Sequence, residues 1–94
     1  MISTINSFND HYNTSDTSLA VYLYCQGFEI FDIDYSNPRA NIIFKEDSKA
    51  LREHERLYYT DKALISPTTY ARIHKRLNTI IRRQQPWTEG VLNA

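Results

Sequence analysis

Residues 14–35 read TSDTSLAVYLYCQGFEIFDIDY and carry most of the information about the fold. The Thr-Ser-Asp sequence at residues 14–16 offers side-chain oxygens to the free amides of a helix start, and Gly27 suits the left-handed conformation that ends a helix. We therefore predict a helix over about residues 16–26, buried on several sides because its middle is almost continuously apolar. A buried strand is the alternative for this stretch, and the capping residues and the length favour the helix.

A β-hairpin is predicted directly after this helix. Residues 28–35 are rich in β-forming side chains, and residues 40–45 form a second, shorter run of the same kind. Turn-forming residues at 36–39 separate the two runs, so we expect a hairpin with a loop of about four residues. Strict alternation along the first run would divide its side chains between two faces. One face would carry Glu29, Phe31, Ile33 and Tyr35, and the other Phe28, Ile30, Asp32 and Asp34.

Two further helices are predicted in the second half of the chain. Asp47 or Ser48 can cap a helix that runs through about Leu57. Ser66 followed by proline is a strong start for a last helix, which we expect over residues 67–84. A short third strand near residues 62–65 would support the hairpin, because an isolated hairpin is marginally stable in water.

The predicted fold is therefore α+β, in the order helix, β-hairpin, helix, helix. We expect one small domain over residues 14–84, because 94 residues leave no room for a second core. Residues 1–13 are predicted to form a polar N-terminal arm, and residues 85–94 a C-terminal tail. The tail either folds back onto its own core or reaches another subunit.

Charge is distributed unevenly along the chain, although the formal net charge is zero. Residues 1–38 contain five acidic residues and no base, whereas residues 62–88 contain six bases and no acid. Residues 39–61 hold five residues of each sign. The two ends of the chain can therefore present surfaces of opposite charge, and neutrality does not exclude a strongly charged partner.

The sequence also bears on the compartment in which the protein acts. Cys25 is the only cysteine, so no disulfide within the chain can stabilise the fold. The longest apolar run, residues 19–25, is far shorter than the roughly 20 residues of a membrane span. The first residues lack the basic and apolar regions of a secretory signal. We expect a cytoplasmic protein with no membrane partner.

Several short motifs occur in an order that resembles a known family. They are the Thr-Ser-Asp helix start at residues 14–16, the helix end at Gly27, Asp34 near the end of a strand, and IFKED at residues 43–47 before a charged helix. Over residues 14–83 the chain resembles a small bacterial and phage domain family of unknown function. The resemblance implies the same α+β fold and an accessory role in a phage or mobile element, and it transfers no functional residue.

Residues that could carry catalysis are scattered in the sequence. Asp32 and Asp34 point the same way from a predicted strand and could hold a divalent cation, but no third ligand accompanies them. Cys25 lies in an apolar helix without an adjacent base. The three histidines have no zinc-ligand spacing, and we expect His54 and His74 to be hydrogen-bonded within the core. We therefore predict no catalytic residue, metal site or cofactor, and no enzymatic activity.

The basic face of the last helix is the main candidate site. Five cations lie mostly outside its apolar stripe and could meet DNA or RNA phosphates together: Arg72, Lys75, Arg76, Arg82 and Arg83. A solvated face is the simpler interpretation, because cations near a helix C-terminus are stabilised by the helix dipole. The leading hypothesis is a non-enzymatic accessory or regulatory protein that contacts nucleic acid through this helix.

A protein-interaction module is the alternative hypothesis. The acidic first third could pair with the basic last third of a neighbour, giving a homo-oligomer, or with that of the same chain. It could also block a host nucleic-acid-binding protein. Aromatic residues are favoured in the centres of interfaces. The candidates for such an interface are Tyr58, Tyr59 and Trp87, with Tyr12 as a further exposed tyrosine.

Overall fold

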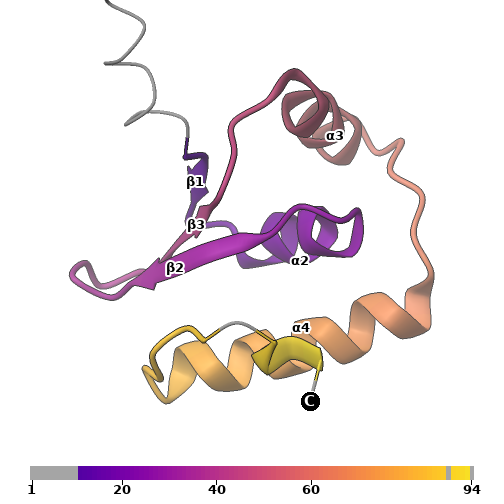
Figure 1. Ribbon diagram of the computed structural model, residues 1–94. Helices are drawn as coiled ribbons and strands as arrows, with labels where there is room; N and C mark the ends of the chain where they lie inside the picture. Colours follow the sequence, from indigo (N-terminus) through magenta and orange to yellow (C-terminus); the bar gives the residue numbers. More distant parts are fainter. Residues whose placement is uncertain (1–10, 89, 94) are drawn as a thin grey trace, which may run out of the picture.

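A small antiparallel sheet and three α-helices are formed by residues 11–88 and 90–93, the part of the chain that this computed structural model describes (Figure 1). The predicted α+β class and the order helix, hairpin, helix, helix are confirmed. The elements are β1 (Asn13–Thr14), α2 (Thr17–Cys25), β2 (Ile30–Asp34), β3 (Asn41–Phe44), α3 (Lys49–Tyr59), α4 (Pro67–Arg82) and a final 3₁₀ turn, η2 (Val91–Asn93).

Each α-helix begins at the capping residue that the sequence offers. Asp16 caps α2, Ser48 caps α3 and Ser66 caps α4, each accepting a hydrogen bond from the backbone amide three residues further on. Pro67 takes the first position of α4, where a helix needs no amide donor. These local interactions explain why the helix starts could be predicted from short motifs.

The third strand of the sheet is β1, and the prediction of a strand near residues 62–65 is wrong. The strand order is β1-β3-β2, and β1 pairs with β3 in the register Asn13↔Ile43. The Phe44 amide also donates to the Tyr12 carbonyl at 2.7 Å. Residues 62–65 instead belong to the loop that joins α3 to α4, away from the sheet (Figure 1). The segment that leads into α2 therefore pairs with the edge of β3 that β2 leaves open.

Strand β2 does not follow the strict alternation that its sequence suggests. A register shift between Ile30 and Asp32 lets Ile30 and Ile33, three positions apart, both point into the core. Phe31 is consequently left 52% exposed. Asp32 and Asp34 still lie on the outer side of the strand, exposed and half-buried respectively.

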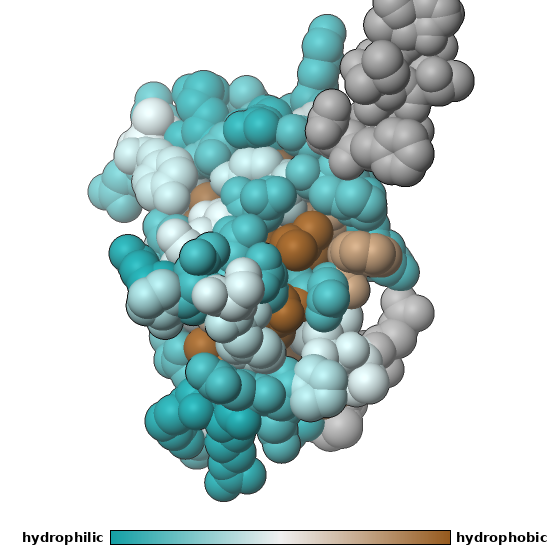
Figure 2. Space-filling model, turned by 90° about the vertical axis from the view of Figure 1, so that its left-hand side faces the viewer, coloured by the Kyte–Doolittle hydropathy of each residue, from teal (hydrophilic) through white to brown (hydrophobic). Residues whose placement is uncertain are grey.

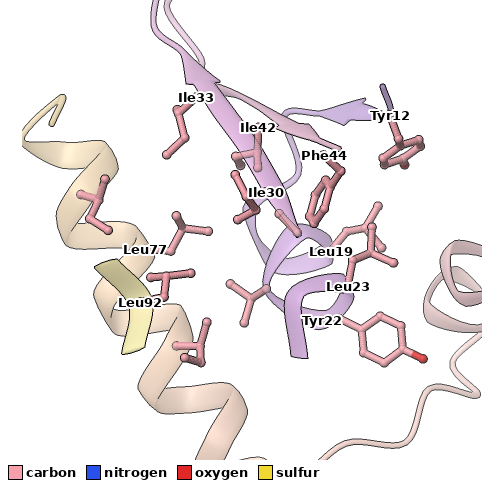
Figure 3. Packing of buried hydrophobic residues seen from close by; sticks show 14 of the residues in the cluster. Tyr12, Leu19, Tyr22, Leu23, Ile30, Ile33, Ile42, Phe44, Leu77 and Leu92 are labelled. Atoms are coloured by element: carbon pink, nitrogen blue, oxygen red, sulfur yellow. The ribbon is translucent and has the colours of Figure 1, made fainter. Parts of the chain in front are cut away.

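Helix α2 lies at the centre of the core (Figure 3). Its residues 19–23 are all buried, and strands β2 and β3 cover one side while α4 covers another (Figure 3). Burial of this helix on several sides is therefore confirmed. The surface seen in Figure 2 is mostly hydrophilic, with a small brown hydrophobic area near its middle.

Both ends of the described chain are anchored to this core. Tyr12, expected in a loose polar arm, is buried, and its hydroxyl donates to the Glu55 carboxylate at 2.6 Å. Most of the predicted arm, residues 1–10, lies outside the described residues. At the other end Leu92 is fully buried in the core cluster, so the tail folds onto its own chain.

We predict that Leu92→Ala lowers the free energy of unfolding by about 3 kcal/mol, because it leaves a cavity beneath the tail. Leu64→Ala is the matched control, since Leu64 is 87% exposed and its loss should change stability by less than about 0.5 kcal/mol. Urea unfolding of the two variants measures both values. Equal stabilities would show that the tail does not dock.

Candidate functional site

Helix α4 divides into a buried stripe and a basic face, as its sequence predicts. Ile73, Leu77 and Ile80 are buried against the core. Tyr70 and His74 on the same stripe are half-buried. Outside this stripe lie the five predicted cations, of which four are exposed and Arg76 is half-buried: Arg72, Lys75, Arg76, Arg82 and Arg83.

The structure gathers four of these cations around one groove of about 540 Å³ between α4 and the C-terminal segment. We call it the basic groove, and its lining residues are Arg72, Lys75, Arg76, Thr79, Ile80, Arg83, Gln85 and Val91. Arg82 lies beside a neighbouring hollow that also contains His74 and Asn78. Lys75 and Thr79 border both hollows, so the five cations form one continuous surface.

Arg76 differs from the other four cations because it is half-buried and bound to its own chain. Its Nη2 donates to the Val91 carbonyl at 2.8 Å. Its Nε is buried and has no hydrogen-bond partner among the described residues. This contact joins α4 to the tail, fifteen residues further on, and no local sequence pattern indicates it.

The basic face is not neutralised by acidic side chains of the described chain. No carboxylate within residues 11–88 and 90–93 forms an ion pair with any of the five α4 cations. The acidic residues nearer the N-terminus are engaged elsewhere: Glu29 pairs with Lys45 at 2.9 Å, and Asp16 caps α2. The charge polarity of the sequence therefore persists in three dimensions over this part of the molecule.

Asp32 and Asp34 accept hydrogen bonds from nearby backbone amides. Asp32 accepts from the Ile33 amide at 2.8 Å, and Asp34 accepts from the Ser36 amide at 2.9 Å. Hydrogen bonds from Ser36 hold the pKa of Asp34 below its usual value. Among the described residues, no group of three or more His, Cys, Asp or Glu side chains is placed to hold a metal ion.

A separate hollow, which we call the tyrosine pocket, lies where α2, α3 and α4 meet. It measures about 610 Å³ and is lined by Tyr22, Tyr58, Tyr59, Asp61, Ala63, Ile65, Pro67 and Tyr70. Two of the predicted interface residues, Tyr58 and Tyr59, therefore line the same pocket. Trp87 lies apart from them and borders a small hollow with Ile30, Phe31 and Lys45. Tyr12, predicted to be exposed, is buried.

The sequence does not identify the other members of the tyrosine pocket. Tyr22 lies on α2, and Tyr70 lies near the start of α4. Each belongs to an apolar helix face, and only the packing of the three helices brings both rings beside Tyr58. Their convergence is therefore a tertiary effect. The one hint in the sequence of a tyrosine-rich site is the number of tyrosines, seven in 94 residues.

The remaining candidate residues are held by hydrogen bonds or partial burial. The His54 Nδ1 and the Tyr22 hydroxyl are joined by a 3.0 Å hydrogen bond, and His74 bonds to Asn78 at 3.0 Å. The predicted hydrogen bonds are therefore present, but both rings are only half-buried and lie outside the core cluster in which they were expected. Burial raises the pKa of the Cys25 thiol, against an opposing effect of Arg72.

Comparison with known protein families identifies the family of the chain. A family model described as Domain of unknown function (DUF5659) matches residues 9–83, in agreement with the resemblance seen in the sequence. The matched region contains the sheet, all three α-helices and all five α4 cations. No curated protein and no solved structure matches the chain. No helix among the described residues is long and apolar enough to cross a membrane.

We predict that Arg76→Ala lowers the free energy of unfolding by about 1.5 kcal/mol, because it removes the charged hydrogen bond to Val91. Arg82→Ala removes the same charge from an exposed position and should change stability by less than about 0.5 kcal/mol. Chemical unfolding measures both. If the two variants are equally stable, the Arg76 contact with the tail does not contribute.

The phenol of Tyr59 provides a prediction for alkaline pH. Burial, together with the 2.7 Å hydrogen bond that its hydroxyl donates to Asp16, raises the pKa of Tyr59 to about 12. An unfolded tyrosine ionises near pH 10. Because the folded pKa is the higher one, the stabilisation is complete below about pH 10 and disappears as the pH rises towards 12.

We therefore expect the urea midpoint to fall across this window, and to fall less in Tyr59→Phe. Asp16→Asn is the matched variant, because asparagine still caps α2 but removes the anionic acceptor. Phenolate absorbance should show one tyrosine titrating earlier in Asp16→Asn than in the parent. An unchanged titration curve would contradict the Asp16–Tyr59 interaction.

Proposed function

The chain belongs to this family of domains of unknown function, and we propose that it acts by binding, with the α4 basic face contacting the phosphate backbone of a nucleic acid. The observation that carries the proposal is the basic groove, in which four cations converge without acidic partners in the described part of the chain. Binding without catalysis, as an accessory or regulatory protein, is the corresponding role.

The length of the basic face suits several phosphates at once. Arg72 and Arg83 are eleven residues apart, which corresponds to about 16 Å along a helix. One strand of a duplex advances about 3.4 Å per phosphate along its axis. A backbone aligned with α4 would therefore pass several of these cations.

The helix dipole does not account for all of these cations. It favours positive charge only within the last turn of a helix, which for α4 includes Arg82. Arg72 and Lys75 lie in the middle of α4, where this effect has faded. The dipole therefore does not explain these two charges, and contact with a polyanionic partner would use them.

Contact with the backbone is favoured over recognition of bases. The basic groove contains no aromatic side chain on which a base could stack. The large exposed hydrophobic residues of the described chain are Phe31, Tyr59 and Leu64, none of which lies on α4. The expected binding is thus dominated by charge and depends little on the nucleotide sequence.

The test measures binding of short duplex DNA and RNA by fluorescence anisotropy at low and moderate salt. We expect salt-dependent binding with a log-log slope of roughly −4 for the parent. The triple variant Arg72→Gln/Lys75→Gln/Arg83→Gln should lower affinity and reduce this slope by about 2.7. Arg76 is left intact because its loss would also disturb the tail.

The matched control is Arg39→Gln/Lys49→Gln/Lys62→Gln, which changes net charge equally at exposed positions outside α4. Its affinity should stay close to that of the parent. If both triple variants lose the same affinity for nucleic acid, net charge alone explains the binding and the α4 face is not the site. Absence of binding by the parent at low salt would contradict the proposed function outright.

The alternative role as a protein-interaction module is supported by one specific observation, the tyrosine pocket that contains Tyr58 and Tyr59. The third predicted interface residue, Trp87, lies beside a different hollow. A single interface built on all three residues is therefore not favoured. In this alternative role, the protein partner is better placed at the tyrosine pocket.

A further inference from the structure

We propose that the tyrosine pocket binds an arginine side chain of a protein segment, with the guanidinium held by tyrosine rings and the Asp61 carboxylate. The site lies at the junction of α2, α3 and α4 and shares no lining residue with the basic groove. Tyr70 also borders the neighbouring hollow beside Arg82, but none of the residues changed in the α4 triple variant lines the tyrosine pocket, so the two proposals can be tested separately.

The pocket offers ring surfaces more than free hydroxyls. The Tyr22 hydroxyl is bonded to His54 at 3.0 Å, and the Tyr59 hydroxyl donates to Asp16 at 2.7 Å. The Tyr70 hydroxyl donates to the Ser18 carbonyl at 3.2 Å. These bonds fix the rings of all three tyrosines. Because Tyr22 is only 2% exposed, the ring surface open to a ligand comes from Tyr58, Tyr59 and Tyr70, and it is largely prearranged before any ligand arrives.

Aromatic ring surfaces beside a carboxylate select a cation. The ring quadrupole attracts positive charge, and a guanidinium suits such a site because it is planar and weakly hydrated. Tyr58 sits between two other rings, with centroid separations of 5.6 Å to Tyr22 and 5.3 Å to Tyr59. Asp61 supplies the negative charge in the pocket lining. A phosphate or a nucleotide would be repelled by that carboxylate.

Asp61 occupies a position where aspartate is unfavourable for stability. It follows the C-cap of α3 with a φ of 64°, and the Lys62 amide closes the turn by donating to the Leu57 carbonyl at 2.9 Å. Glycine is the favoured residue at such a left-handed helix end. A negative charge is also disfavoured there by the helix dipole. Helix α4 ends in the same way, with Gln84 at a φ of 50°, so what sets Asp61 apart is that its carboxylate lines a pocket of tyrosine rings.

The pocket has room for more than the guanidinium. Its volume of about 610 Å³ falls within the usual range for ligand sites. Ala63, Ile65 and Pro67 form an apolar wall for the aliphatic part of the arginine. Leu64, 87% exposed between two of these residues, is available to an apolar neighbour of the arginine. The fitting ligand is thus a short segment with arginine flanked by apolar residues.

The experiment titrates the full chain, followed by ¹H–¹⁵N NMR, with the blocked peptide acetyl-Leu-Arg-Leu-amide. The matched peptide replaces arginine with citrulline, which has nearly the same shape and no charge. We expect the arginine peptide to shift amide signals within residues 58–65, and the citrulline peptide to bind about tenfold more weakly. Absence of shifts in this region, or equal binding of both peptides, would overturn the proposal.

Two substitutions of Asp61 separate binding from folding. Asp61→Asn removes the charge and tolerates the left-handed backbone, so it should weaken binding about tenfold with an intact spectrum. Asp61→Gly should also weaken binding while raising the urea midpoint. Glu46→Gln removes an exposed acid outside the pocket and should bind as the parent does. If Glu46→Gln weakens binding as much as Asp61→Asn, the attraction is nonspecific and the proposal fails.

A single-stranded oligonucleotide serves as the competing ligand class. We expect it to leave the signals of residues 58–65 unshifted, since base stacking would bring phosphates close to Asp61. Shifts of these signals by the oligonucleotide would assign the pocket to nucleic acid instead. Loss of oligonucleotide binding in the α4 triple variant, with arginine-peptide binding unchanged, would show that the two sites are separate.

Discussion

The need to bury α2 on nearly every side determines the rest of the structure. Its residues 19–23 are all removed from solvent, which a single packing partner cannot achieve. The sheet, α3 and α4 each supply one covering surface, and the short strand β1 leads directly into the helix (Figure 1). Each covering element therefore has only one face occupied by the core, and its other face is free to carry function.

The two candidate sites result from this arrangement because each lies where covering elements meet. The basic groove lies between α4 and the tail, and Leu92 anchors that tail in the core. The tyrosine pocket lies between α2, α3 and α4, where the loop from residue 61 to 66 crosses from one covering helix to the other (Figure 1). One site is cationic and the other contains a carboxylate, so the ligands proposed for them have opposite charges.

Features set by neighbouring residues could be predicted from the sequence, and features set by distant ones could not. Ser48 and Ser66 each cap a helix by accepting a hydrogen bond from the amide only three residues further on. The pairing of β1 with β3 depends on residues about thirty positions apart, and so the third strand was expected in the wrong place. The same limit applies to the sites. The cations of α4 have helical spacing, whereas the Arg76–Val91 contact and the meeting of Tyr22 with Tyr70 arise only on folding.

The zero net charge of the chain says little about what either site encounters. At physiological ionic strength the Debye length is about 8 Å, and the 16 residues of α4 extend over about 24 Å. A ligand at the basic groove therefore senses mainly the charges within about one Debye length of it, and four cations line that groove. Because no described carboxylate pairs with these cations, the local charge of α4 is the quantity that governs its encounters.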